Sequence, residues 1–370
     1  MPSHFRSPIS HLYVHIPFCT HICPYCAFHK ERNLLPAMKA FLPALKLEIA
    51  RARDIFDLQP ETVFFGGGTP SALSISQLED LFSIWPRTWT DVPEFTFEAN
   101  PMTFSPDKAR RLRDWGVNRI SLGVQSFDDG LLQLLGRTHR RDDIRRTMDL
   151  LRGAGFRNIN VDLMFSLPGQ TIGQWVDSLE QALALQPEHI STYNLTYEED
   201  TAFLEKHRRG EFVSDESTDR SHFTCAMDVL ETAGYGQYEI SNFARPGFES
   251  RHNQAIWEGR DYLGLGPSAV STVGGLRWKN IADTLRYAAS VREGGPSERE
   301  EEILTEDLRQ DERTMLALRT REGVPAAWLV RKAEETARLL EAGLLERSGD
   351  RFTLTRFGKL VADSVTELLV

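Results

Sequence analysis

The sequence predicts an α/β fold: a parallel sheet curved into a partial (β/α)6 barrel, followed by a small, mainly helical domain. Two observations support this prediction. Short runs rich in β-branched and aromatic residues alternate with longer helical patterns, giving six strand–helix units between residues 11 and 195. Polar or glycine-rich residues directly follow several of these runs, as is typical where ligands bind at the carboxyl ends of parallel strands.

Six segments are expected to form the strands of this sheet. They are HLYVHIPF at 11–18, TVFFGGG at 62–68, EFTFEANP at 94–101, RISLGVQ at 119–125, NINVDLMF at 158–165 and HISTYNL at 189–195. The segments between them have helical patterns, such as QLEDLFSIW at 77–85 and DDIRRTMDLLRGAG at 142–155, which ends on a glycine suited to a helix C-cap. Because helical crossovers join parallel neighbours, we expect the six strands to be parallel.

The chain is expected to divide into three parts. Residues 1–285 would form the barrel and its extension, and the charged stretch 286–305 would form a connector. Residues 306–370 have helical periods around a short strand, RFTLT at 351–355, and a winged-helix-like arrangement fits this order. In an acidic chain such a domain more often packs against the rest of the protein or binds a partner than binds DNA.

Charge and hydropathy exclude several classes of function. The formal net charge of −10 over 370 residues gives no electrostatic reason to expect nucleic-acid binding, which favours basic faces. The first residues lack the apolar core of a signal peptide, and eighteen apolar residues never run together. We therefore expect a cytoplasmic protein.

Three of the four cysteines, Cys19, Cys23 and Cys26, lie within eight residues. In a reducing compartment such a group indicates a metal or catalytic site, and thiolates select zinc or iron–sulfur clusters. Two interpretations stay open. One is structural zinc, completed by a nearby histidine: His15, His21 or His29. The other is a 4Fe-4S cluster with one iron left open. Cys225, in a helical pattern, is most simply a small buried residue.

The C-x3-C-x2-C spacing is similar to that of the radical S-adenosylmethionine (radical SAM) superfamily. From His11 to about Lys279 the chain resembles the branch that contains the oxygen-independent coproporphyrinogen III oxidases and the haem chaperones of the HemW group. The tail segment LTRFGKLVADSVTELL resembles the C-terminal domain of that group. The matching segments are LYVHIPFC, CPYCAF, FFGGGTPSAL, FEANP, NRISLGVQSFDDGLLQLLGRTH, NINVDLMFSLPGQT, YEISNFARPG, HNQAIW and DYLGLGPSAVS.

This resemblance implies a 4Fe-4S cluster on Cys19, Cys23 and Cys26, with SAM chelated at the open iron. An electron from the reduced cluster would cleave the sulfonium bond and release a 5′-deoxyadenosyl radical. Arg137 would pair with the SAM carboxylate and Asp162 with the ribose hydroxyls, both on strand ends away from the thiolates. The implied SAM contacts are Tyr13, Tyr25, Gly67, Gly68, Thr69, Glu98, Gln125, Arg137 and Asp162.

Two departures separate the oxidases from the chaperones. The oxidases carry a further cysteine two residues after the triad, where this chain has Phe28, and they have an additional N-terminal segment that this chain is expected to lack. The HemW group has a His-Asn-x-x-Tyr-Trp motif thought to engage haem. It begins here at His252, the implied axial ligand, but Ile256 replaces its tyrosine and Ser250 stands where many members have a cysteine.

Three hypotheses about function follow. The first is a haem chaperone that binds a cluster, SAM and haem, and delivers haem to respiratory haem proteins, including recipients at the membrane. Such a chaperone would also need an electron donor for the cluster as a partner. The second is a catalytic radical SAM enzyme, either a coproporphyrinogen III oxidase, whose activity is not expected, or a methyltransferase or cyclopropanase. The third is a zinc-stabilised binding module, which the GGGTP and GVQS segments disfavour.

Overall fold

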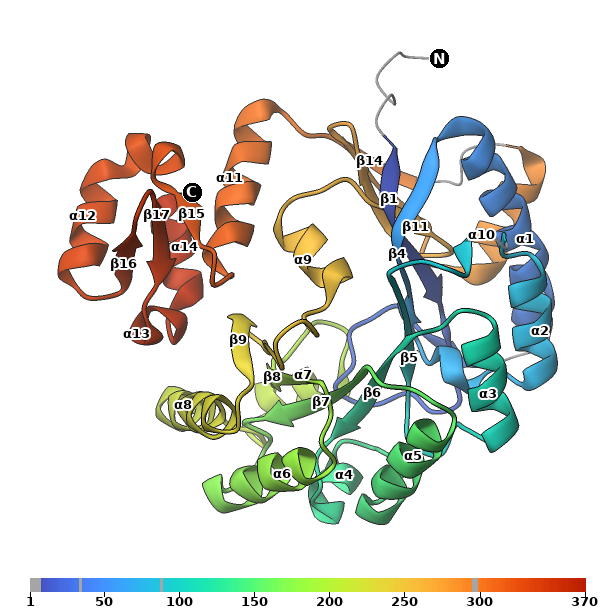
Figure 1. Ribbon diagram of the computed structural model, residues 1–370, viewed down its shortest axis with the longest axis horizontal. Coiled ribbons are helices and arrows are strands. Elements are labelled where there is room, and N and C mark those ends of the chain that lie inside the picture. The colour runs from blue at the N-terminus through green and yellow to red at the C-terminus, as the bar shows by residue number, and fades with distance from the viewer. Residues whose placement is uncertain (1–7, 33–34, 87–88, 295–298) are drawn as a thin grey trace.

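The computed structural model describes residues 8–32, 35–86, 89–294 and 299–370. Nine strands form one open, curved sheet in the spatial order β11-β1-β4-β5-β6-β7-β8-β10-β9 (Figure 1). The six expected strands are its consecutive parallel members, which confirms the predicted α/β class. They are β1 (Ile9–Ile16), β4 (Leu58–Gly67), β5 (Glu94–Ala99), β6 (Arg119–Gln125), β7 (Ile159–Phe165) and β8 (His189–Asn194).

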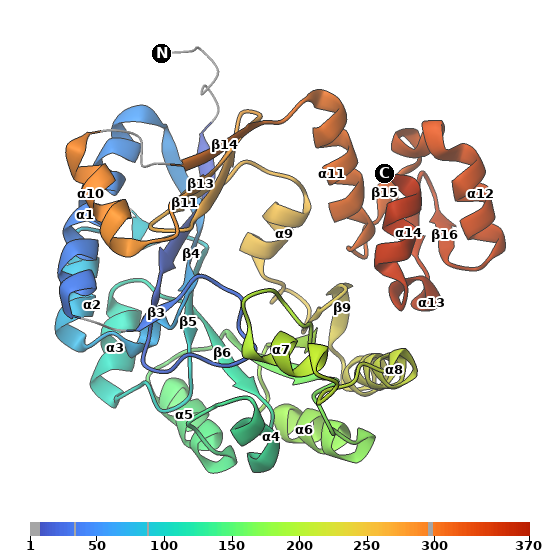
Figure 2. The same ribbon diagram turned by 180° about the vertical axis from the view of Figure 1, so that it is seen from behind.

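Helices cover the convex face of this sheet, and the two opposite views show them as an outer layer (Figures 1 and 2). The helix expected over 142–155 forms α5, and Gly155 follows it with a φ of +92°, a conformation that suits glycine. No helix in the described part of the chain is long and apolar enough to cross a membrane. The helices of this region are α1 (Leu35–Ile55), α2 (Ile75–Ser83), α3 (Pro106–Asp114), α4 (Asp129–Leu134), α5 (Arg141–Gly153), α6 (Ile172–Ala184), α7 (Ala202–Arg208) and α8 (Glu216–Thr232).

Short elements extend the sheet at both ends. Strand β11 (Leu263–Leu265) pairs in parallel with β1, whereas β10 (Asn242–Ala244) and β9 (Gly236–Glu239) continue antiparallel beyond β8. The cysteine loop is bracketed by β2 (Phe18–Cys19) and β3 (Glu31–Arg32), which pair with each other. A 3-10 turn, η1 (Pro70–Ala72), follows β4.

The expected connector 286–305 carries regular structure where it is described. It contains most of α10 (Thr284–Glu293), which packs on α1, and all of β14 (Arg299–Ile303). Strand β14 is the outer member of a three-stranded antiparallel sheet with β12 (Val270–Val273) and β13 (Leu276–Asn280). Its charged side chains are those of an exposed edge strand, which explains why the composition resembles a linker. Residues 295–298 lie outside the described residues.

The C-terminal region has a hydrophobic core of its own, formed around buried residues such as Leu318, Leu339 and Val365. Its sheet has the order β15-β17-β16, and the expected RFTLT strand is β17. Its elements are α11 (Glu306–Leu318), β15 (Val324–Pro325), η3 (Ala326–Lys332), α12 (Ala333–Glu341), β16 (Leu345–Ser348), β17 (Arg351–Leu354), α13 (Arg356–Lys359) and α14 (Ala362–Leu369). The mainly helical character is thus confirmed, and the winged-helix-like description stays a prediction.

Helix α9 (Arg251–Trp257) lies on the concave side of the sheet, between the strands and α11 (Figure 1). Glu94, buried at the start of β5, accepts hydrogen bonds from the backbone N–H groups of Arg251 and His252, at 2.8 and 3.0 Å. Ser250 Oγ donates to the same carboxyl group at 3.3 Å. A carboxylate at a helix N-terminus satisfies free N–H groups and complements the helix dipole, so Glu94 ties α9 to the sheet.

Candidate functional site

The three clustered cysteines lie beyond the carboxyl end of β1: Cys19 ends β2, and Cys23 and Cys26 lie in the loop between β2 and β3. Cys19 is 9% exposed, whereas Cys23 and Cys26 are half-buried and share a turn in which Cys26 N donates to Cys23 O at 3.2 Å. All three are free thiols. Burial raises the pKa of the Cys19 thiol and that of the Cys26 thiol, so both favour the neutral form until a cation or metal stabilises the thiolate.

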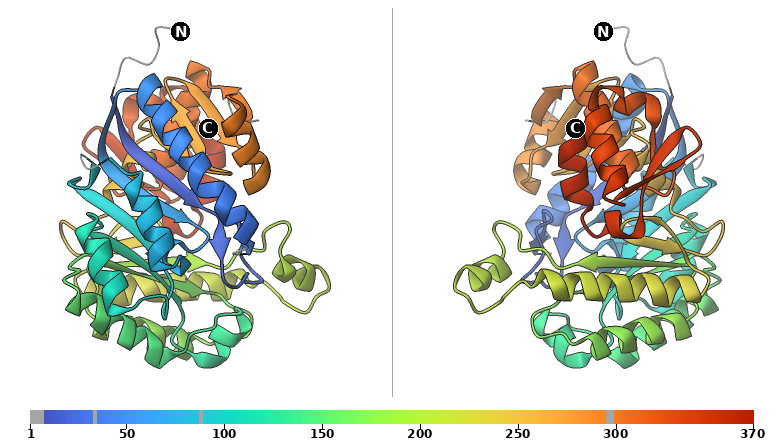
Figure 3. Two further views of the ribbon diagram at one scale, coloured as in Figure 1. Left: turned by 90° about the vertical axis from the view of Figure 1, so that its right-hand side faces the viewer. Right: turned by 90° about the vertical axis from the view of Figure 1, so that its left-hand side faces the viewer.

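The loop packs against the segment around α7, which projects from the same side of the molecule (Figure 3). Phe203 N donates to Pro24 O at 3.1 Å, and the ring of Phe203 lies 6.1 Å from that of Tyr25. The two rings belong to a separate apolar cluster that includes Leu135 and Leu195. Tyr25 is therefore oriented toward α7, and this apolar cover restricts water on one side of the cysteine loop.

A continuous line of polar contacts joins the cysteine loop to the strand ends. Cys19 Sγ lies 3.5 Å from Thr69 Oγ1, which accepts from Asn100 Nδ2 at 3.1 Å. Asn100 Oδ1 accepts from Arg137 Nη2 at 2.5 Å, and Arg137 Nη1 donates to Cys23 Sγ at 3.7 Å. Residues from four separate segments thus converge beside the thiols.

The glycine run at 66–68 makes room for other parts of the protein. A Cβ on Gly66 would lie 3.0 Å from the Glu98 carboxyl group, and one on Gly68 would lie 2.7 Å from the carbonyl oxygen of Phe18. Gly67 has a φ of +108°, and a Cβ there would lie 2.5 Å from the ring of His15. Close packing of the strand end therefore requires glycine at 67 and 68 whether or not a ligand is present, whereas a Cβ at 66 would require the Glu98 and Phe64 side chains to shift.

Two carboxyl groups, those of Glu98 on β5 and Asp162 on β7, lie near enough for the charge of Asp162 to act on Glu98. Glu98 Oε2 accepts from Gly67 N at 3.1 Å. Asp162 accepts from Ser121 Oγ at 3.1 Å and from Asn160 Nδ2 at 2.7 Å. Burial, and secondly the Asp162 charge, raise the pKa of Glu98 to about 8, while burial raises the pKa of Asp162. The two groups therefore favour a positively charged ligand group or a protonated Glu98.

Strained backbone marks the same edge of the sheet. Gln125, which ends β6, has a φ of +70°, and Met102 and Ser166, just after β5 and β7, have values of +67° and +58°. Such conformations are uncommon for residues other than glycine and gather at binding and active sites. Gln125 also coincides with a register shift between β6 and β7. Three adjacent strands therefore end in irregular backbone around the polar contacts described above.

Tyr13 and His15 form the wall contributed by β1. Tyr13 OH lies 3.0 Å from His15 Nδ1, and the other ring nitrogen of His15 lies 2.9 Å from the carbonyl oxygen of His29. Burial lowers the pKa of His15 to about 4, so the ring is neutral at physiological pH. Both of its nitrogens are occupied, which leaves His15 no free position for a metal. In the described part of the chain, no three His, Cys, Asp or Glu side chains are placed to hold a single metal ion.

His252 belongs to a different set of contacts from the other candidate residues. Its Nδ1 lies 2.9 Å from Thr62 Oγ1, which also lies 2.9 Å from His11 Nδ1, and its ring packs 5.1 Å from that of Phe64. The side chain is 2% exposed, and burial lowers its pKa to about 3. In this conformation His252 holds α9 against β4, and a haem iron reaches it only if α9 moves.

Sequence reasoning did not single out Asn100, which links Thr69 to Arg137, although Asn100 stands in the FEANP segment that was noted. Nor did it single out Asn160 and Ser121, which orient Asp162. Their positions gave a weak indication of a role, because each residue lies on or directly after a predicted parallel strand. Neutral amides and hydroxyls carry no charge pattern, so only their position marks them.

Comparisons with known proteins agree with this geometry. The profile of the Radical SAM superfamily matches residues 13–182. The haem chaperone HemW of Bacillus subtilis is 37% identical over 371 residues, covering 95% of this chain and 97% of its own length. HemW of Escherichia coli is 33% identical and covers 98% of both chains. The solved structure of the E. coli coproporphyrinogen III oxidase HemN, a radical SAM enzyme, shares the fold with a TM-score of 0.86 at 24% identity, covering 99% of this chain and 91% of the oxidase.

The curved parallel sheet and the three-cysteine loop at its edge define a radical SAM protein. Within that superfamily, the chain belongs to the HemW family. Membership implies a 4Fe-4S cluster and SAM. The residues present fit the cluster and SAM. Three free thiols can bind iron, and the cationic, amide and carboxyl groups near them can bind the amino-acid and ribose parts of SAM.

Proposed function

We propose that this protein is a haem chaperone of the HemW type, which binds haem and passes it to haem proteins. The observation that carries the proposal is identity over nearly the whole chain to relatives named as haem chaperones, 37% in the Bacillus subtilis protein. Respiratory haem proteins, including recipients at the membrane, are the proposed acceptors. The proposed site of action is the cytoplasm.

The proposed cluster ligands are Cys19, Cys23 and Cys26, which leave one iron for SAM. When bound and reduced, the cluster would supply the electron needed for any cleavage of the sulfonium bond of SAM. Arg137 would pair with the SAM carboxylate, since its guanidinium lies at the cysteine loop and is always charged. Asp162 would accept from the ribose hydroxyls, and Glu98 would face the cationic part of SAM. Tyr13, Gly67, Gly68, Thr69 and Gln125 would line the rest of the pocket, with Tyr25 closing it toward α7.

The exposed side chain at position 28 supports a chaperone in preference to an oxidase. Phe28 is 72% exposed within the cysteine loop, at the position where the resemblance places a further cysteine in the oxidases. A phenyl ring offers neither a thiolate nor a proton to a substrate at this position. We therefore propose that coproporphyrinogen III is not decarboxylated here.

The test begins with anaerobic reconstitution of the cluster. One portion is titrated with haem, followed through the haem absorption band, and then mixed with a haem-free acceptor protein. A second portion receives SAM, a reductant and coproporphyrinogen III, and is assayed for protoporphyrinogen IX and 5′-deoxyadenosine. We expect haem binding and transfer without decarboxylation.

The Phe28→Cys variant is the matched control for the oxidase signature. It should still bind haem and should remain unable to decarboxylate, because a single thiol does not rebuild a substrate pocket. Robust decarboxylation by the unaltered protein would contradict the chaperone assignment, and so would failure to bind haem at all.

A further inference from the structure

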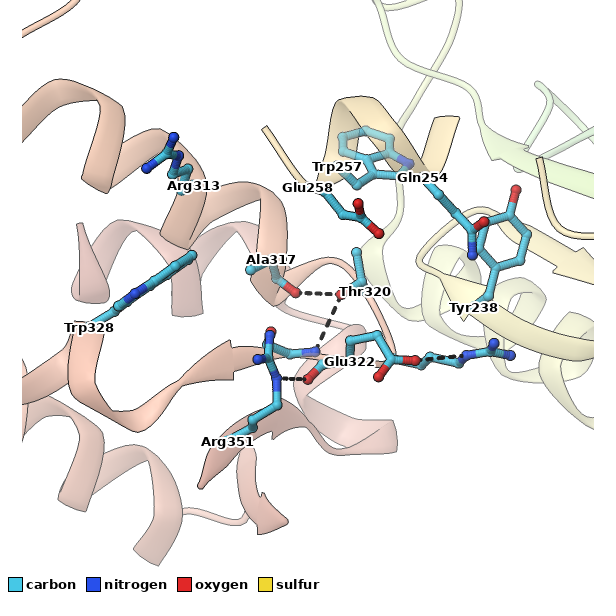
Figure 4. A pocket seen from close by; sticks show the side chains of 12 residues that line it. Tyr238, Gln254, Trp257, Glu258, Arg313, Ala317, Thr320, Glu322, Trp328 and Arg351 are labelled. Carbon is cyan, nitrogen blue, oxygen red and sulfur yellow. Dashed lines mark hydrogen bonds and ion pairs between the residues drawn. The ribbon is translucent and has the colours of Figure 1, made fainter. Parts of the chain in front are cut away.

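A cavity of about 340 Å³ lies between α9 and the C-terminal region, away from the cysteine loop (Figure 4). One wall is made by Tyr238 of β9 and by Gln254 and Trp257 of α9, and the opposite wall is made by α11 and the residues that follow it. Its size lies in the range of small-molecule sites, roughly 300–1,000 Å³. None of the cysteines or expected SAM contacts lines it.

Two tryptophans supply the aromatic surface of this cavity. Trp257 extends from α9, and Trp328 extends from η3 on the C-terminal side (Figure 4). The Arg319 guanidinium lies over the Trp257 ring, 4.9 Å from its centre. Trp257 Nε1 is a buried donor without a hydrogen-bond partner among the residues that the structure describes. Indole rings bind planar conjugated molecules by offset stacking.

Of the three lining arginines, Arg313 and Arg351 have no carboxylate partner in the described part of the chain. Of the two lining glutamates, Glu258 pairs with Arg260 at 2.7 Å, and Glu322 pairs with Arg321 at 3.3 Å. Arg351 donates to the carbonyl oxygens of Glu322 and Gly323, each at 2.6 Å. Arg313 differs from Arg351 in that it has neither an ion-pair nor a hydrogen-bond partner in the described part of the chain.

The position of Arg313 is nevertheless defined. Its aliphatic stem packs so closely on Gly259, which has a φ of +67°, that a Cβ on that glycine would lie 3.0 Å from Arg313 Cγ. Its guanidinium is therefore free to form a bidentate pair with a carboxylate of a bound ligand.

The lining contains no usual strong ligand for haem iron. Among its described members there is no histidine, cysteine or methionine. Tyr238 OH is engaged with His189 Nε2 at 2.9 Å and with Ser250 N at 3.3 Å. His252 lies five positions before Trp257, and positions so spaced on a helix are about 140° apart, so its ring packs against β4 instead.

We propose that this cavity is the haem site, and that it holds haem by its ring and one propionate while leaving the iron without a bond to the lining residues. Trp257 and Trp328 contact the porphyrin, and Arg313 pairs with the carboxylate. The inference rests on the proposed function, because that function identifies haem as the planar, carboxylate-bearing ligand. Such a site suits delivery, since release breaks no strong iron–protein bond.

The test compares haem with iron-free protoporphyrin IX on the full-length protein, using absorbance and porphyrin-fluorescence titrations. The wild type should bind both with similar affinity. Arg313→Gln should raise both dissociation constants by about tenfold or more, as expected for one charged hydrogen bond, and Arg313→Lys should recover part of the loss. Arg331→Gln, which alters an arginine 89% exposed on the same region, is the matched control and should bind normally.

Trp328→Phe provides a second variant that keeps an aromatic ring, and it should weaken both porphyrins without lowering the thermal midpoint greatly. Unchanged affinities in both Arg313→Gln and Trp328→Phe would overturn the location while haem binding itself stood. Loss of haem, but not of protoporphyrin IX, in His252→Ala would overturn the absence of an iron–protein bond. Failure of the wild type to bind either porphyrin would instead remove the proposed function and the cavity assignment together.

Discussion

Arg137 and Cys23 are in direct contact: the guanidinium Nη1 lies 3.7 Å from the thiol sulfur. The other terminal nitrogen donates to Gly123 O at 2.6 Å, so one side chain joins the cysteine loop to the end of β6. The sequence-based expectation that Arg137 lies away from the thiolates was wrong. Its position follows from α4, which leads the chain back over the strand ends before α5 begins.

Replacing Arg137 by alanine should therefore weaken two properties together. The loss of a fixed cation beside Cys23 should reduce iron retention during gel filtration, and SAM affinity should fall by roughly ten- to a hundredfold. Iron content and calorimetric SAM titration measure the two effects. Arg145→Ala, at an exposed position on α5, should change neither. Intact SAM affinity in Arg137→Ala would show that the carboxylate binds elsewhere.

Replacing any one of Cys19, Cys23 or Cys26 by serine should remove most of the cluster. The anaerobically prepared protein should contain about four irons and four sulfides per chain, because three thiolates with one open iron hold a cubane. Cys225→Ser is the matched control, since Cys225 lies on α8 far along the chain, and it should keep the full complement. Stoichiometric zinc without sulfide in iron-replete preparations would contradict this prediction.

Asp162→Ala should lower SAM affinity by roughly ten- to a hundredfold while leaving the iron–sulfur absorbance unchanged. The reason is its position on β7, where it contacts Ser121 and Asn160 and no cysteine. Asp149→Ala, at an exposed position of α5, serves as the control. Equal SAM affinity in both variants would show that the ribose does not contact Asp162.

The raised pKa of Glu98 predicts that the stability of the ligand-free protein depends on pH. Its pKa is about 8 in the folded state, above the ordinary value of 4.5, so the folded state binds the proton more tightly than the unfolded state. This contribution is fully present below pH 4.5 and is lost as the pH rises through about 8. The change in the free energy of unfolding caused by Glu98→Gln should therefore be more favourable at pH 9 than at pH 5, by about 1 kcal/mol or more. Denaturant titrations at the two pH values measure the difference, and an equal effect at both would refute the assigned pKa.

The six parallel strands could be predicted from the sequence because each is a largely buried run rich in β-branched or aromatic residues, and most are followed by polar or glycine residues. The burial pattern of β6 illustrates this: every residue from Arg119 to Val124 is buried, and only Gln125 is not. The antiparallel strands β9 and β10 were not predicted, because three- and four-residue strands have too few positions to show a period.

The candidate site could be predicted only in part, because side chains meet there from segments far apart in the chain. Cys19, Cys23 and Cys26 were evident from spacing alone. Asn100 was not, since its role depends on Thr69 and Arg137 lying on either side of it. The burial of His252 was equally inaccessible, because it arises from Glu94 and Thr62, which stand more than 150 residues earlier and have no motif.

Because Glu94 attaches α9 to the sheet, the cavity wall formed by α9 is more rigid than the opposite wall. The hydrogen bonds to that carboxyl group are buried and lie on the sheet, so dissolved ions scarcely weaken them. The opposite wall belongs to a region joined to the barrel by several ion pairs, and in two of them, Arg356 with Asp228 and Arg321 with Glu249, the arginines are 40% and 46% exposed. Exposed pairs of this kind contribute little and are screened by salt. Added salt should thus weaken these two contacts of the C-terminal region while α9 stays in place, and the rate at which cargo leaves should rise with ionic strength.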